Sequence, residues 1–142
     1  TEALSYFYKV EYLEKSPDNA RRAIAWCSFV AGKHEEAMKY YRLLLESPAP
    51  KAQDWLNAGH VHFADKRTAE AIGHYRKAQE KEKDHSTFIE RFYKDKEVLL
   101  SQGLNEEDIR ITLTGLEVIR WQIDLLALEH TAQRLIEERQ VY

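Results

Sequence analysis

The chain has 142 residues, 44% hydrophobic and 32% charged, which is enough to bury a core as one domain without disulfides or a structural metal. Its 21 basic and 24 acidic residues give a net charge of −3, which argues against a nucleic-acid-binding protein, because such proteins usually carry a basic excess. No run of about 18 apolar residues occurs, so we expect no membrane insertion. The single cysteine, Cys27, excludes an internal disulfide and favours the cytoplasm.

The composition, with only 5 Gly and 3 Pro, favours an all-α fold. We predict helices over about 2–15, 18–31, 34–47, 51–65, 68–82, 86–101 and 106–114, followed by one or two helices from 116 to 139. Ser16 and Pro17 suit the N-cap and first turn of the second helix, and Pro48 and Pro50 end the third. Asn105 suits the N-cap of a helix whose first turn is acidic, as the helix dipole favours.

A short pattern recurs three times at a spacing of 34 residues. An alanine is followed four residues later by an aromatic residue in Ala3 and Phe7, Ala37 and Tyr41, and Ala71 and Tyr75. The preceding helices also align, with Ala25 matching Gly59, Phe29 matching Phe63, and Gly32 matching Lys66 at the turn. Residues four apart share one helix face, so a small residue lets a second helix approach while the aromatic fills the space beside it. The period predicts stacked pairs of helices.

The stretch from Trp55 to Tyr75 resembles the tetratricopeptide repeat (TPR). The family pattern is W-x2-L-G-x2-Y, then A-x3-F, then P, and this chain keeps Trp55, Gly59, Ala71 and Tyr75. It departs from the pattern at Ala58, His62 and Lys83. The resemblance implies an α-solenoid of antiparallel helix pairs, forming a TPR-like superhelix.

We divide the predicted solenoid into three parts of one continuous domain. Residues 1–83 form the TPR-like repeats, with the first repeat reduced to its second helix, as in a fragment of a longer repeat protein. Residues 84–115 form a degenerate third repeat, in which the turn glycine, Gly103, comes three residues late and Asp108 replaces the alanine. Residues 116–142 form a C-terminal capping or dimerisation helix.

Two apolar stripes follow this last segment. One stripe consists of Leu116, Ile119, Ile123 and Leu126, and the other of Leu125, Leu128, Ala132 and Leu135. A solenoid needs an atypical last helix to cover its exposed end, and this favours a capping role. A heptad pattern fails at His130 and Gln133, which disfavours a long coiled coil. The second stripe keeps homodimerisation open.

The histidines of the GHVHF stretch do not predict a metal site. His60 and His62 lie two residues apart, so they point to opposite sides of a helix, whereas metal-binding pairs on a helix need a spacing of four. His62 stands at a TPR core position, which predicts a packed ring with one satisfied nitrogen, and His74 should reach the surface. Cys27 has no catalytic motif around it and is expected to be a small buried residue. We therefore expect no enzyme activity, metal or cofactor.

The resemblance implies a binding role for one face of the chain. In TPR proteins the first helix of each repeat lines a concave groove that binds a peptide or a partner protein. The matching positions here are Asn19, Arg22, Trp26, Phe29, Gln53, Leu56, His60, Phe63 and Tyr93. One TPR subclass binds a C-terminal carboxylate, but Trp26 replaces an asparagine of that clamp, so an extended or helical apolar segment fits this predicted floor better.

The sequence therefore predicts a protein-interaction scaffold rather than an enzyme. The expected partner is a protein or a peptide segment held in the groove. Two alternatives stay open at this point. The chain could be a structural module that forms homodimers through its C-terminal helices, or a regulatory domain of a larger protein.

Overall fold

The computed structural model describes residues 2–13 and 17–140, and these residues form eight helices and no strand. The helices are α1 (Glu2–Leu13), α2 (Asp18–Val30), α3 (His34–Leu45), α4 (Ala52–Ala64), α5 (Thr68–Lys81), α6 (His85–Lys94), α7 (Lys96–Ser101) and α8 (Glu106–Gln140). The predicted all-α class is confirmed. The N-cap predicted at Ser16 lies outside the described residues, and Pro17 directly precedes α2.

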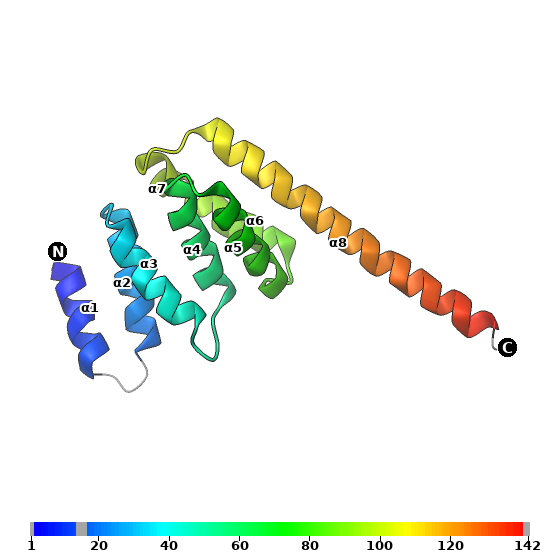
Figure 1. The fold of residues 1–142 in the computed structure, drawn as a ribbon, viewed down its shortest axis with the longest axis horizontal. Helices are drawn as coiled ribbons and strands as arrows, with labels where there is room; N and C mark the ends of the chain where they lie inside the picture. The colour runs from blue at the N-terminus through cyan, green and yellow to red at the C-terminus, as the bar shows by residue number, and fades with distance from the viewer. Residues whose placement is uncertain (1, 14–16, 141–142) are drawn as a thin grey trace.

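Helices α1 to α5 pack in chain order, each against the next one along the chain (Figure 1). The residues that match at 34 form much of the core between them. Ala37 and Ala71 are buried, and so are the rings of Tyr41 and Tyr75. In α1, by contrast, Ala3 is exposed and Phe7 is half-buried. Because α1 lies at one end of the described row of helices, its matching face has fewer neighbours to cover it.

Three turns of the chain share one backbone geometry. Gly32, Lys66 and Gly103 all have positive φ, at 80°, 64° and 95°. At each turn the next N–H donates to a carbonyl five residues back, as from Lys33 to Ser28, and the turn residue donates three residues back. This is the Schellman ending of a helix, which a left-handed residue permits. The first two turns lie 34 residues apart and the third 37 residues further on, so the same ending recurs with three extra residues.

His34 connects these three turns. Its Nδ1 pairs with the carboxylate of Asp65, which follows α4, and its Nε2 lies 2.6 Å from Oε1 of Gln102, which follows α7. Gln102 also donates to the carbonyl of Val30 at the end of α2. The ends of α2, α4 and α7 are therefore held side by side by polar contacts that span up to 72 residues of sequence.

The helix predicted over 86–101 is broken in the structure. It divides into α6 and α7 at Asp95, whose carboxylate lies 3.0 Å from Nε2 of His60 in α4. The break turns α7 toward α2, where Gln102 makes the contacts just described. The turn at Gly103 comes three residues later than a period of 34 would put it. In a continuous helix these residues would rotate the buried side chains away from the core, and the break at Asp95 avoids this.

The predicted division between 106–114 and the last segment is wrong, because α8 runs without interruption for 35 residues. The predicted cap is confirmed: the backbone N–H of Asp108 donates to Oδ1 of Asn105 at 2.8 Å. Gly115 lies at an exposed position inside the helix and does not end it. A single glycine costs a helix only about 1 kcal/mol, which packing of the flanking turns offsets.

Only the first part of α8 covers the core. Ile109, Leu113 and Leu116 are buried, and Gln79 of α5 donates to the carbonyl of Leu116 at 2.9 Å. Arg120 donates to the carbonyl of Lys83, just past the end of α5. Beyond this point every described side chain through Arg139 is exposed, and Figure 1 shows α8 extending away from the other helices. The capping role predicted for the C-terminal segment therefore fits only its first turns. The side chain of Ile123 lies outside the described residues.

Candidate partner-binding surface

The structure corrects four of the nine predicted groove residues. Phe29, Leu56, His60 and Phe63 have at most 3% of their surface exposed, so a partner cannot reach them. Phe29, Leu56 and Phe63, expected in the apolar floor of the groove, are instead part of the protein core. The physical reason is the path of the chain after α5: α6 packs Phe92 against His60, and α7 crosses toward α2.

His60 is a fully buried polar residue that holds two helices to α4. Its Nδ1 lies 2.8 Å from the hydroxyl of Tyr75 and its Nε2 lies 3.0 Å from Asp95. Burial lowers the pKa of His60, and the hydrogen bond that the ring makes to Asp95 opposes this effect only in part. The neutral ring then donates from Nε2 to Asp95 and accepts from the Tyr75 hydroxyl at Nδ1. Burial also raises the pKa of Tyr75 well above its usual value, which keeps that hydroxyl a donor.

His62 of α4 and His74 of α5 lie side by side. His62 is buried as expected, and its ring centroid lies 4.7 Å from that of His74, whose Nδ1 contacts the carbonyl of Glu70. The Nδ1 of His62 is buried and has no hydrogen-bond partner. Burial and then the neighbouring His74 lower the pKa of His62. Among the residues that the structure describes, no three His, Cys, Asp or Glu side chains are grouped to hold a metal ion.

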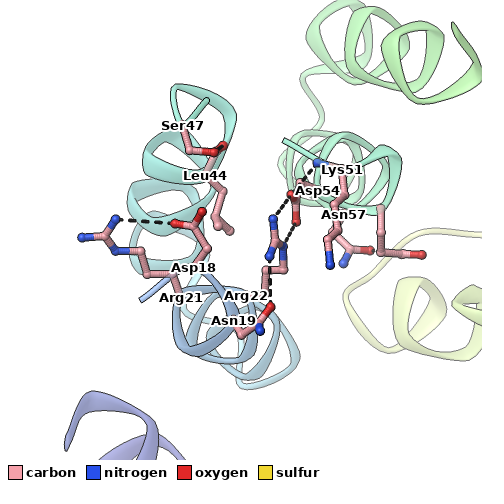
Figure 2. A network of polar contacts seen from close by, with 10 residues as sticks. Asp18, Asn19, Arg21, Arg22, Leu44, Ser47, Lys51, Asp54 and Asn57 are labelled. Carbon is pink, nitrogen blue, oxygen red and sulfur yellow. Dashed lines mark hydrogen bonds and ion pairs between the residues drawn. The ribbon is translucent and has the colours of Figure 1, made fainter. Parts of the chain in front are cut away.

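Arg22 and Asp54 form the centre of a polar network between α2 and α4 (Figure 2). The guanidinium donates to both carboxylate oxygens of Asp54, at 2.8 and 2.9 Å, and also to Oδ1 of Asn19 at 3.1 Å. The Asp54 side chain is only 1% exposed and accepts a further bond from the backbone N–H of Lys51, the N-cap residue of α4. The hydrogen bond with Asp54 raises the pKa of Arg22. This pair fixes the spacing of the two helices and neutralises the arginine.

Amide side chains flank this ion pair. Gln53 donates from Nε2 to Oδ1 of Asn57 at 2.9 Å, one turn along α4, and Asn19 is exposed on α2. Trp26 is half-buried one turn beyond Arg22, with its ring centroid 5.7 Å from that of Phe29. We call this surface the α2–α4 face. It comprises Asn19, Arg22, Trp26, Gln53 and Asn57.

Tyr93, the last of the predicted groove residues, is exposed but lies away from the α2–α4 face. It lines a separate hollow of about 230 Å³ with Lys96 and Ile109. Arg91, which no sequence pattern indicated, lines a narrow crevice with Gln53 between α4 and α6 and pairs with Glu82. The sequence could not predict that Gln53 and Arg91 lie close together, because their proximity depends on how α6 packs.

The chain matches none of the known proteins it was compared with. No family model, no curated protein and no solved structure is similar to it at a significant level. Among the helices of the described ranges, none combines the length and the apolar character needed to cross a membrane. Cys27 is a free thiol and is half-buried, whereas the sequence predicted a buried residue.

Proposed function

We propose that the chain is a TPR-like protein-interaction module. The spacing of 34 residues between matching alanine and aromatic residues supports this, and so does the repeated turn at Gly32, Lys66 and Gly103. In a repeat of this kind each helix pair buries its apolar face against the next pair. The polar surface left on the first helices is then available to a partner.

The binding site of the module is the α2–α4 face, and its ligand is an extended peptide segment. The observation that carries this proposal is the row of amide side chains Asn19, Gln53 and Asn57 beside the Arg22–Asp54 pair. Each amide offers both a donor and an acceptor, which is what the backbone of an extended peptide requires. Trp26 adds a half-buried aromatic surface for one apolar side chain of the ligand.

The charge state of the face argues for a neutral backbone rather than a terminal carboxylate as the ligand. Arg22 already holds a carboxylate through two hydrogen bonds, so little of its charge is left to attract another anion. If Arg22 released Asp54 to bind another anion, the Asp54 carboxylate would be left buried and unpaired, which would destabilise the fold. The proposed ligand therefore binds through hydrogen bonds and the Trp26 ring.

A selection from a library of displayed linear peptides on the immobilised chain supplies the probe for this site. We expect the Asn57→Ala variant to bind a selected peptide at least tenfold more weakly, a loss of about 1.4 kcal/mol. The matched control is Gln133→Ala, which also removes an amide but from the exposed part of α8. Equal affinity of both variants for the peptide would contradict this site.

A further inference from the structure

α8 carries apolar residues on two opposite sides. The inner side contains Ile109, Leu113 and Leu116, which are buried against the rest of the chain. The outer side carries a second row, which we call the outer stripe: Val118, Trp121, Leu125, Leu128, Ala132 and Leu135. All six of these side chains are exposed, Trp121 by 64% and Leu128 by 66%. Leu116 and Val118 differ by about 200° around the helix, so the outer stripe faces away from the packed side.

The outer stripe has the spacing of a coiled-coil seam. Its residues alternate steps of three and four, so Val118, Leu125 and Ala132 take the a positions of successive heptads and the other three take the d positions. From Val118 to Leu135 the seam runs for about 26 Å at 1.5 Å per residue. A lone helix of this length is marginal in water, and six apolar side chains in one row form a surface that proteins usually cover.

We propose that the outer stripe pairs with the outer stripe of a second copy of this chain, in antiparallel orientation. The stripe is complementary to itself when reversed. Leu125 then lies opposite Leu128 of the second copy, Val118 opposite Leu135, and the large Trp121 opposite the small Ala132. In antiparallel coiled coils a residues face d residues, so all three layers form twice in one symmetric interface.

A parallel pairing of the same helices would be unfavourable. It would stack Trp121 on Trp121 and leave Ala132 facing Ala132, so that one layer is overfilled and another is empty. It would also place Arg139, which continues the a series, against its own copy. On the flanks, Asp124 would face Glu129 of the second copy, which is a like-charge pair.

The antiparallel pairing removes the mismatched Trp121 and Ala132 layers. On its flanks Gln122 lies beside Glu129 of the second copy and Asp124 beside Thr131, while Glu117 meets Glu138 near the ends, so the size match of Trp121 with Ala132 decides the orientation rather than the charges. The two helix dipoles are also opposed, which is favourable. Because α5 packs against the inner side of α8, it leaves the outer stripe uncovered. The pairing does not involve the α2–α4 face, so this inference and the proposed function stand or fall separately.

Sedimentation equilibrium of the whole chain tests the pairing. We expect a concentration-dependent dimer for the unaltered chain and a monomer for a variant with both Leu125→Glu and Leu128→Glu. Both leucines are exposed in the monomer, so helicity by circular dichroism should be preserved. Leu126→Glu is the matched control, because Leu126 is 56% exposed on the same helix but outside the stripe, and it should remain dimeric. An unaltered chain that stays monomeric at roughly 100 μM, or equal loss of dimer in both variants, would overturn the proposal.

Disulfide trapping in a Cys27→Ser background tests the orientation. Trp121→Cys and Ala132→Cys chains, mixed and then oxidised, should form a covalent dimer, because the two positions face each other in the antiparallel pair. Each variant oxidised alone should stay uncrosslinked, since in that pair the two copies of position 121 are roughly 16 Å apart along the axis. Covalent dimers formed by either variant alone, and none gained by mixing, would show a parallel pair and overturn the proposed register.

Discussion

Gly59 in α4 lies directly against the ring of Tyr75 in α5. A Cβ atom built on Gly59 would be 2.6 Å from Cε1 of that ring, closer than side-chain atoms pack. The two residues are the small and aromatic members of the repeated pattern, and α4 and α5 cross where they meet. The glycine of the GHVHF stretch therefore allows the two helices to approach closely. His60, the next residue, forms a hydrogen bond with the hydroxyl of the same tyrosine.

Gly59→Ala should destabilise the fold by roughly 1–3 kcal/mol through overpacking. The ring of Tyr75 has no room to withdraw, because it is fully buried and lies against Phe63 and Phe92. Gly73→Ala in α5 is the control, since nothing lies within 4 Å of its added Cβ, and it should stabilise by up to about 1 kcal/mol. Urea unfolding of both variants measures the difference. A neutral Gly59→Ala would show that the two helices do not cross this closely.

Arg22→Ala should lower the free energy of unfolding by about 2–3 kcal/mol, because it leaves the carboxylate of Asp54 buried and unpaired. The loss should be smaller than for a fully buried pair, since 21% of the Arg22 side chain is exposed. Arg21→Ala, which removes a 3.9 Å contact with Asp18 at the surface, should cost less than about 1 kcal/mol. Equal losses in chemical denaturation of the two variants would mean that the Arg22–Asp54 pair has no structural role.

Acidification should destabilise the fold through His60. Its pKa is lowered in the folded chain, so the unfolded chain takes up the proton first as the pH falls. The free energy of unfolding therefore has its full value above pH 6.5, the usual pKa of histidine. It decreases as the pH falls through 6.5 toward the lowered pKa of His60 in the folded chain. His62, also lowered, acts in the same direction.

Urea unfolding at pH 7.5 and at pH 5.5 measures this effect. The difference in unfolding free energy between the two pH values should be smaller in His60→Gln than in the unaltered chain. Glutamine can keep both hydrogen bonds, to Tyr75 and Asp95, but does not titrate. An unchanged pH dependence in the variant would assign the effect to other groups.

His34→Ala should loosen the three aligned turns rather than unfold the chain. The variant loses the contacts of the ring with Asp65 and Gln102, which are partly exposed, so a cost of about 1–2 kcal/mol is expected. Amide hydrogen exchange should rise most at Gly103 and Leu104, whose N–H groups close the turn after α7. Faster exchange confined to α1 would contradict the role given to His34.

Local patterns in the sequence predicted most of the helices. The positions of α2 to α5, the cap at Asn105 and the turns at Gly32 and Lys66 all follow from residues within one or two helical turns of each other. Such features depend on backbone preferences and on the spacing of apolar residues, both of which can be read directly from the sequence.

The proposed binding face could not be predicted in the same way, because it depends on what covers each helix. Helical spacing placed Phe29 and His60 on one face of the first helices, but it does not show that α6 and α7 cover that face. Their path depends on contacts between residues far apart in the chain, such as His60 with Asp95 and Gln102 with Val30. The exposed Asn19 and the half-buried Gln53 and Asn57 of the α2–α4 face became apparent only once those buried residues were excluded.

The most direct test of the proposed binding face is a two-dimensional NMR titration of the isotope-labelled chain with a selected peptide. The side-chain amide signals of Asn19, Gln53 and Asn57 should shift together with the indole N–H of Trp26, while those of Gln122 and Gln133 on α8 stay in place. Shifts at Tyr93 and along α8, with the α2–α4 amides unmoved, would contradict the binding site proposed for this protein.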